Sequence, residues 1–443
     1  MIDFLSINEE RGATMKMELA YYEIFPKIVQ SGVRTKITIR PLGKHAEFKD
    51  DAEYMVMFLP MDESNESLDT EYDSLILRSD DGSLYFDYEF SGEQAYIVRV
   101  FRTPVKDAER DRPVGNFMVY SLFPDLYKLR PYKGEFHCHS YHSDGNEAPE
   151  IVAANYRKNG FDFMALTDHH LWYPSKIAVD AYKDTPIDLK LFYGEEVHPF
   201  RNHVHMVNFG GSYSVNELFE KDPDRYYREI NEIMEGLEVP EGVNAFQYAS
   251  CVWCFDRIRE SGGLGIFCHP HWIANVYHIP EKLIDYLFEN IPFDAFELLG
   301  GHEVYSNNMQ TAYYNEARAK GMKIPIVGAS DSHGTEFGNW FNWMYTIVFS
   351  EDLELESIKD SVKNLYSVAV EHYPGEAFRV YGPYRLVKYA DFLLNEYFPL
   401  HHALCYEEGR LMKDYVCGDT KALELLRLMK GRTEALLEKC FKA

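Results

Sequence analysis

Short apolar runs separated by turn segments dominate the first part of the chain. Between residues 17 and 124, runs such as TKITIRPL, EYMVMFLPM and AYIVRVFR alternate with polar and glycine-containing stretches. Alternation with a period of two is typical of strands, and Asp80-Asp81-Gly82 indicates a hairpin turn. The pattern therefore predicts an antiparallel β-sandwich, immunoglobulin-like in layout, over residues 1–130.

The pattern changes near Tyr132, where strands begin to alternate with helices. Apolar runs predict strands at 161–166, 190–193, 204–208, 264–267, 295–299 and 325–327, and helical spacing predicts helices at 149–159, 280–290 and 315–320. Repeated βα units predict an α/β domain with a mainly parallel sheet, open or closed into a barrel, over residues 131–370. Helical spacing returns from about residue 384, so residues 371–443 are predicted to form a helical C-terminal extension.

The acidic composition narrows the range of partners. The 443 residues include 71 Asp and Glu against 45 Lys and Arg, a net charge of −26 at pH 7. This charge disfavours non-specific binding to nucleic acid and to anionic membrane surfaces. No apolar run is long enough to cross a membrane, and the first residues lack the basic and apolar regions of a secretory signal. We expect a soluble, cytoplasmic protein, and the sequence leaves open whether it forms a homo-oligomer.

The cysteines indicate no disulfide framework and no structural zinc site. Seven are present, mostly isolated, and only Cys251 and Cys254 form a CxxC pair. That pair lies in a segment with helical spacing, and the chain has no second CxxC to complete a zinc site. We interpret both cysteines as residues on or near a buried helix face.

Histidines and carboxylates recur where the predicted strands of the second region begin or end. Parallel strands of a βα barrel converge at their carboxyl ends on one face, where active sites are built. Residues i and i+2 of a strand point to the same side, so His137 and His139 can reach one point, as can Asp331 and His333. The nine candidate ligands are His137, His139, Asp144, His169, Glu196, His205, His269, Asp331 and His333.

This set of side chains indicates a metal centre. Neutral imidazoles and carboxylates without thiolates suit zinc, manganese or iron, and argue against a purely structural zinc. A single isolated histidine is more often an ordinary polar residue, but repetition at strand end after strand end is hard to explain by independent structural roles. At roughly three or four protein ligands per ion, nine ligands suit two or three ions with water-filled positions.

Six segments that carry these residues resemble, in family order, the motifs of the PHP superfamily, named for polymerase and histidinol phosphatase domains. They are GEFHCHSYHSDG, GFDFMALTDHH, GEEV, HVHMVNFG, GIFCHPHW and VGASDSHG, within about residues 133–370. The resemblance implies a distorted (β/α)7 barrel that holds two or three divalent ions, commonly manganese, iron or zinc. The predicted sandwich and helical tail distinguish the chain from minimal histidinol phosphatases, and its length and acidity distinguish it from polymerases. It is more similar to uncharacterised bacterial metallohydrolases of the family, some of whose relatives hydrolyse carbamate esters.

The resemblance also implies how the ligands divide. By the family's pattern, one ion would be held by His137, His139, Glu196 and Asp331, a second by Glu196, His205 and His269, and a third by Asp144, His169 and His333. Glu196 would bridge two ions and hold the nucleophilic hydroxide between them. His205 is preferred over His203 because it directly precedes the apolar run MVNFG.

Residues that follow the motifs are candidates for contact with substrate. His170 and His271 are candidate general acids. Lys176 and Arg201 are candidate phosphate clamps, although an ordinary solvated charge on a loop is the favoured interpretation of both. Further candidates for the substrate pocket are Trp272 and His302.

The predicted function is metal-dependent hydrolysis of a small phosphorylated molecule. Three divalent ions carry about six positive charges against three carboxylates, so the pocket would attract phosphate despite the acidic surface. A metal-bound hydroxide could equally attack a carbonyl, as in ester, amide or carbamate hydrolysis, and the scarcity of nearby Arg and Lys keeps this alternative open. A binding module that holds metals without turnover is the third interpretation, and the presence of all nine ligands argues against it.

Overall fold

A computed structural model of the chain shows a mixed α/β protein, with four sheets among the residues that it describes. It describes residues 21–62, 72–105, 111–300, 304–335 and 340–442. Two compact units are distinguished by their internal contacts. The first consists of residues 1–129, 388–401 and 432–443, and the second of residues 130–387 and 402–431.

The first unit contains two sheets that share one core. A three-stranded antiparallel sheet has the order β1 (Tyr22–Phe25), β3 (Arg34–Pro41), β6 (Leu84–Glu89). A five-stranded sheet has the order β2 (Ile28–Gln30), β8 (Gly115–Leu122), β7 (Gln94–Arg102), β4 (Glu53–Pro60), β5 (Ser74–Arg78). Inward-facing residues of both sheets, such as Ile39, Val56 and Phe117, belong to one hydrophobic cluster. The alternation of apolar and polar residues thus buries one face of each sheet.

The second unit carries the strands whose ends hold the candidate ligands. One sheet has the order β11 (Lys190–Phe192), β10 (Phe163–Ala165), β9 (Arg130–Glu135), β17 (Met344–Ser350), β18 (Ser367–Glu371), β19 (Arg379–Tyr381). The other has the order β12 (Gly194–Val197), β13 (Met206–Phe209), β14 (Leu264–Phe267), β15 (Ala295–Leu299), β16 (Ile326–Gly328). Isolated parallel bridges, Cys138 to Ser332 and His169 to Glu196, join the extensions of strands from the two sheets.

Strand direction in this unit differs from the predicted mainly parallel sheet. β10 is parallel to β9 and β11, and β15 is parallel to β14 and β16, but β13 is antiparallel to both of its neighbours. Only residues 198–205 connect β12 to β13, too few for a crossover helix, so the chain returns beside itself in the opposite direction. β17 is likewise antiparallel to β9 and to β18.

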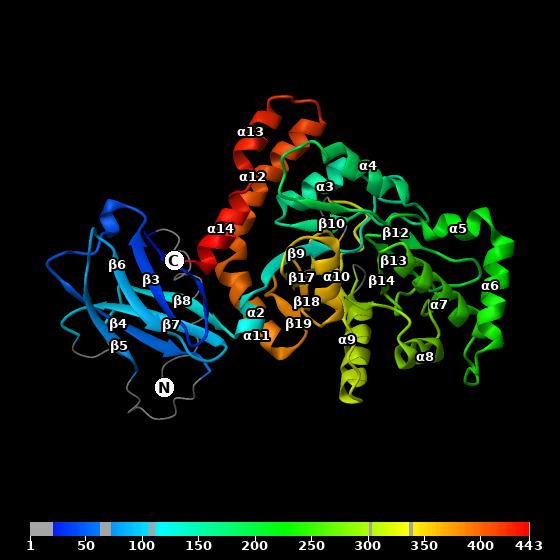
Figure 1. Cartoon of the computed structure of the whole chain (residues 1–443), viewed down its shortest axis with the longest axis horizontal. Helices are drawn as coiled ribbons and strands as arrows, with labels where there is room; N and C mark the ends of the chain where they lie inside the picture. The colour runs from blue at the N-terminus through cyan, green and yellow to red at the C-terminus, as the bar shows by residue number, and fades with distance from the viewer. Residues whose placement is uncertain (1–20, 63–71, 106–110, 301–303, 336–339, 443) are drawn as a thin grey trace. The chain divides into compact units, whose positions relative to one another are not determined.

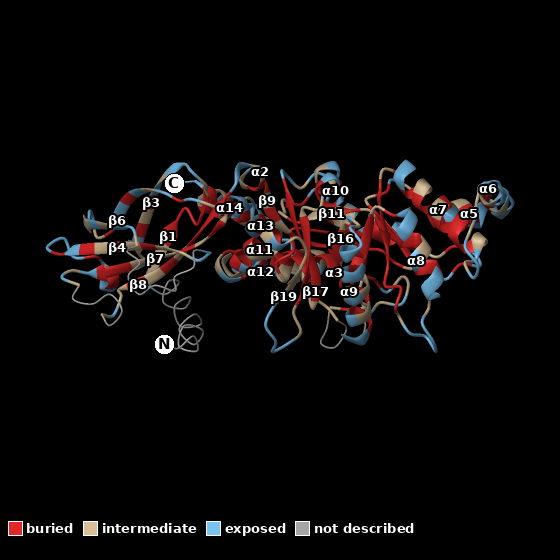
Figure 2. Cartoon of the chain, turned by 90° about the horizontal axis from the view of Figure 1, so that it is seen from below, coloured by how far each residue is buried: buried red, intermediate tan, exposed pale blue. Residues whose placement is uncertain are grey.

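Helices of this unit pack against its strands or against one another. They include α3 (Pro149–Lys158), α4 (Tyr173–Tyr182), α5 (Val215–Lys221), α6 (Pro223–Glu235), α7 (Ala245–Glu260), α8 (Glu281–Asn290), α9 (Val304–Ala319) and α10 (Leu355–Lys363). In Figure 1, α7 lies beside β13 and β14. The strands of the second sheet are buried along their whole length. By contrast, α6 is largely exposed or half-buried (Figure 2), and its buried residues are Tyr226 and Ile230. Burial on both faces explains why these strands read as continuous apolar runs.

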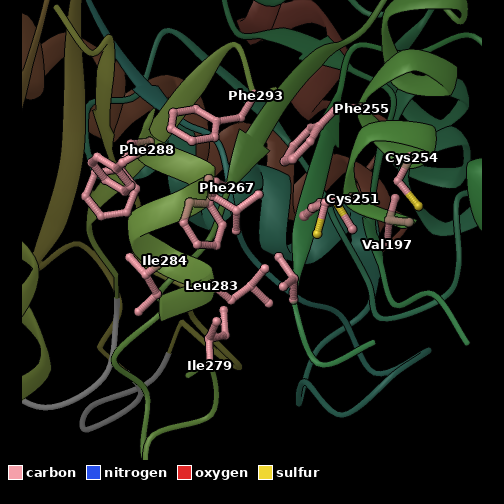
Figure 3. Close-up of a cluster of buried hydrophobic side chains, with 14 of the residues drawn as sticks. Val197, Cys251, Cys254, Phe255, Phe267, Ile279, Leu283, Ile284, Phe288 and Phe293 are labelled. Atoms are coloured by element: carbon pink, nitrogen blue, oxygen red, sulfur yellow. The ribbon is translucent and has the colours of Figure 1, made fainter. Parts of the chain in front are cut away.

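The CxxC pair belongs to the core. Cys251 and Cys254 lie on α7 in a cluster of buried side chains that includes Phe255, Phe267 and Phe288 (Figure 3). Both thiols are free, and burial raises the pKa of each, to about 12 for Cys251. The interpretation as residues on a buried helix face is confirmed.

The C-terminal helices are shared between the two units. They are α11 (Tyr384–Glu396), α12 (Phe398–Val416), α13 (Ala422–Met429) and α14 (Arg432–Phe441). Residues 402–431 belong to the second unit, where Glu408 forms a buried ion pair with Arg157 of α3 at 2.6 Å. Within the described part of the chain, no helix is both long and apolar enough to cross a membrane.

Candidate metal centre

The nine predicted ligands lie on segments that leave the strands of the second unit. His137 and His139 follow β9, His169 follows β10, Glu196 lies within β12, and His205 precedes β13. The other ligands are Asp144, His269, Asp331 and His333. Neighbouring strands bring these segments side by side, because Asp331 donates its backbone N–H to the carbonyl of His137 and Glu196 donates its own to that of Asp168.

The first predicted group of ligands is gathered around two carboxylates. Oδ1 of Asp331 lies 3.3 Å from Nε2 of His137 and 2.9 Å from Nε2 of His139. Oε2 of Glu196 lies 3.4 Å and 3.7 Å from the same two nitrogen atoms. All four side chains are almost completely buried.

The second and third groups are also brought together. Oε1 of Glu196 lies 2.9 Å from Nδ1 of His205 and 3.5 Å from Nε2 of His269. Oδ2 of Asp144 lies 3.4 Å from Nε2 of His169 and 3.3 Å from Nε2 of His333. Glu196 thus presents one oxygen to the first group and the other to the second.

These spacings fit divalent ions. With bonds of about 2.0–2.2 Å, the ligand atoms of a four- to six-coordinate ion lie about 3.0–3.5 Å apart, and the eight distances above range from 2.9 to 3.7 Å. Nε2 of His137, Nδ1 of His205 and both oxygens of Glu196 are buried without a hydrogen-bond partner. Buried polar atoms without partners are costly, and a bound cation would satisfy them. The residues present therefore fit the metal that the motifs imply.

The pKa values reflect how closely charges are packed here. Burial would raise the pKa of Glu196, but the surrounding imidazoles lower it well below its usual range. Burial lowers the pKa of His139 to about 4 and that of His205 to about 3. Burial would also lower the pKa of His169, but the carboxylates of Glu196 and Asp144 raise it to about 10. Protons and cations compete for such a cluster, because only deprotonated groups coordinate a metal.

A second carboxylate orients His137. Nδ1 of His137 lies 2.8 Å from Oε2 of Glu297, which projects from the middle of β15, and both side chains are fully buried. With the proton on Nδ1 donated to Glu297, Nε2 remains free to coordinate. Glu135 supports the same segment by accepting hydrogen bonds from the backbone N–H groups of His137 and Ser330.

The loop that carries Asp144 is held by a buried carboxylate. Asp168 accepts hydrogen bonds from the backbone N–H and hydroxyl groups of both Ser140 and Ser143. The turn also requires a glycine, because a Cβ atom on Gly145 would lie 2.8 Å from the carbonyl oxygen of His139. Asp144 is therefore presented by a loop of fixed shape although its side chain is half exposed.

Three residues of the site have unusual backbone conformations. His170, His269 and Asp331 have φ values of 62°, 23° and 47°. Positive φ is rare for residues other than glycine and is concentrated at functional sites, where the surrounding structure holds it in place. These residues lie two to five positions after the ends of β10, β14 and β16.

A cavity of about 670 Å³ lies beside the ligands. Its lining residues are His142, Ser143, Asp144, His169, His170, Leu171, His198, His205, Trp272 and His278. The predicted substrate residues Trp272 and His170 are therefore at the cavity. No lysine or arginine is among the described residues that line it.

Other predicted substrate residues lie elsewhere. Lys176 forms an ion pair with Asp180 along α4, and the guanidinium of Arg201 lies 5.1 Å from the centre of the Phe246 ring. The side chain of His271 is buried against Tyr277 and Tyr313 rather than on the cavity wall. His302 is outside the described residues.

Sequence reasoning missed two residues of this site, His198 and Glu297. Nε2 of His198 lies 3.2 Å from Oε1 of Glu196. Both had a signal in the sequence. His198 follows Glu196 by two residues, the spacing that joins His137 to His139, and Glu297 is a lone charge inside the apolar run AFELL.

Comparisons with known proteins find distant structural similarities. No family model matches the chain, and no curated protein matches it significantly. Among solved structures, the chain is similar to a two-domain protein from Bacteroides vulgatus containing a predicted PHP-like metal-dependent phosphoesterase, with 17% identity over 57% of this chain and 68% of that one and a TM-score of 0.40. It is also similar to an amidohydrolase from Chromobacterium violaceum, with 19% identity over 45% of this chain and 87% of that one and a TM-score of 0.31. Because both TM-scores are below 0.5, neither similarity indicates a function for this chain.

Proposed function

We propose that this protein is a metal-dependent hydrolase, and specifically a phosphoesterase acting on a small phosphorylated molecule. The observation that carries this proposal is the convergence of six imidazoles and three carboxylates at ligand spacing beside a cavity. Structural roles alone would not leave buried oxygens of Glu196 without partners.

The ligands would form three groups, of which the first two would share Glu196. The first is His137, His139, Glu196 and Asp331, the second is Glu196, His205 and His269, and the third is Asp144, His169 and His333. When bound, divalent ions supply Lewis acidity and lower the pKa of a bound water toward about 7, so that hydroxide is available at neutral pH.

The protein's own residues would orient and protect this chemistry. Glu297 holds His137 in one tautomer and one ring position. Trp272 and Leu171 on the cavity wall exclude water from part of the site. His170 is the predicted general acid that reaches the cavity, but burial lowers its pKa, as burial also does for His271, which reduces the protonated fraction near neutral pH.

The residues that line the cavity also support a second candidate function, which is hydrolysis of an ester, amide or carbamate. Phosphate sites commonly use arginine or lysine as clamps, and the described lining has neither. A phosphate would then be held by the ions and by neutral imidazole donors. A carbonyl substrate needs no such clamp.

We also propose that the strands of the second unit close into a distorted (β/α)7 barrel. The ring would run β9, β10, β12, β13, β14, β15, β16 and back to β9. Support comes from the pairings His169 with Glu196 and Cys138 with Ser332, which link the two sheets at both junctions. The shared core of the two sheets in the first unit supports the β-sandwich in the same way.

The test combines metal analysis with two assays. The purified protein is analysed for metal content and assayed with an aryl phosphate and an aryl ester, with His139→Ala as the control. Two to three equivalents of metal, and phosphatase activity lost in the variant, are the expected results. Esterase activity alone would favour the carbonyl function. Less than one equivalent, with no uptake on reconstitution, would contradict the metal centre.

A further inference from the structure

A seventh imidazole lies within the cluster of predicted ligands. His198 follows β12, two residues after Glu196, so both side chains leave the chain on the same side. Its Nε2 lies 3.2 Å from Oε1 of Glu196 and 3.0 Å from Nδ1 of His169. The side chain is 19% exposed and lines the cavity.

His198 lies as close to Glu196 as the histidines of the predicted second group do. Oε1 of Glu196 is approached by Nδ1 of His205 at 2.9 Å, by Nε2 of His198 at 3.2 Å and by Nε2 of His269 at 3.5 Å. Ligand atoms around one ion lie about 3.0–3.5 Å apart. Each of the three imidazole nitrogens therefore lies about as far from this carboxylate oxygen as two ligands of one ion lie from each other.

Neighbouring groups hold the His198 ring in this position. The ring stacks on that of His205 with centroids 3.9 Å apart, and the backbone N–H of His198 donates to Oδ1 of Asn216 at 3.0 Å. Asn216 in turn donates to the backbone carbonyl of Glu196. The side chain of Asn216 thus couples the end of β12 to α5, so that Glu196 and His198 are placed as one unit.

We propose that His198 is a fourth protein ligand of the ion held by Glu196, His205 and His269. This inference rests on the proposed metal centre. Three imidazoles and one carboxylate suit zinc or iron better than manganese, because imidazole is the softer ligand. The second group therefore binds zinc more tightly than the carboxylate-richer first group does.

The test measures metal binding rather than turnover. Apo protein is titrated with zinc and with manganese against a chromophoric chelator, for the wild type, His198→Ala and His198→Gln. X-ray absorption of the zinc-loaded proteins counts imidazoles per zinc. The control is His142→Ala, because His142 also lines the cavity but contacts Tyr141 and Tyr173. Far-UV circular dichroism checks that each variant is folded, and His198→Gln retains most of the side-chain volume.

The expected result is a loss of at least tenfold in affinity for one zinc ion in both His198 variants. The imidazole count per zinc should fall, and manganese affinity should change less. Wild-type affinity in either folded variant would overturn the proposal, and so would an unchanged imidazole count, which would leave His198 as a hydrogen-bond partner of His169. A wild-type protein that binds neither metal would overturn the metal centre itself, so the two failures are distinguishable.

Discussion

Replacing Glu297 tests whether the metal centre depends on residues behind its ligands. Glu297→Leu removes the acceptor for Nδ1 of His137, 2.8 Å away, while keeping an apolar side chain of similar size inside β15. Glu297→Gln keeps an oxygen that can accept the same hydrogen bond but removes the negative charge. The pair of variants therefore separates orientation of the imidazole from its electrostatic support.

The expected loss of metal affinity follows from the burial of both side chains. Neither His137 nor Glu297 is exposed to solvent, so water cannot replace the lost carboxylate. Loss of such an outer partner typically costs about 10–100-fold in metal affinity, or about 1.4–2.7 kcal/mol. We expect Glu297→Leu to lie near the upper end of this range, and Glu297→Gln to lose about tenfold or less because it still orients the ring.

The assay is competition of the apo protein with a chelator of known affinity, followed for each ion. Thermal unfolding of the apo variants shows whether the fold has been retained. Wild-type affinity for every ion in folded Glu297→Leu would refute the reasoning, because His137 would then coordinate without its partner. Equal losses in Leu and Gln would show that charge, rather than orientation, is what Glu297 contributes.

Four further predictions concern stability and the cavity. Burial lowers the pKa of Lys133 from 10.5 to about 7, so between pH 7 and 10 the unfolded chain binds a proton at Lys133 that the folded protein does not bind. In urea unfolding, the wild type should therefore gain stability relative to Lys133→Met as the pH rises from 7 to 10. A constant difference in stability between the two proteins would contradict this prediction. Arg157→Leu leaves Glu408 buried without its ion-pair partner and should lower the free energy of unfolding in urea by about 3–5 kcal/mol. The double variant with Glu408→Leu should recover part of this loss. If the losses of the two single variants simply add in the double variant, the prediction is wrong. Chelation of an ion present at 100 times its Kd should remove about 2.7 kcal/mol of stability and lower Tm by about 3–5 °C, whereas an unchanged melting curve would count against bound metal. Trp272→Ala should raise KM for aryl substrates about threefold to tenfold with unchanged metal content, because Trp272 lines the cavity; an unchanged KM would place the aryl group elsewhere.

The candidate ligands could be predicted because each signal is local. Pairs such as His137 and His139 need only the two-residue period of a strand, and each cluster lies next to an apolar run that is visible in the sequence. His198 obeys the same rule and could have been found by it. Glu297 could be noticed as a buried charge, but its partner is 160 residues away, and no local pattern specifies that contact.

The structure brings only some of the candidate substrate residues to the cavity, because position along the chain does not determine which way a loop side chain points. Lys176 and Arg201 follow motifs closely, yet Lys176 pairs with Asp180 along α4 and Arg201 lies against Phe246. Long charged side chains take whichever nearby partner the fold offers. The cavity is instead lined by imidazoles and Trp272 from separate segments.

The sequence by itself determined the mixed α/β character, the buried strands and helices, and the identity of the candidate metal ligands. Those properties follow from hydrophobic periods of 2 and about 3.6 residues and from residue chemistry, which act over one element at a time. Only the tertiary structure decided the reversed direction of β13 and the placement of the two Glu196 oxygens beside different histidines. It also decided that His198 lies next to Glu196 and that Glu297 lies next to His137. These depend on which strands become neighbours, and strand pairing is settled by burial and connection length across the whole unit rather than by any short stretch of chain.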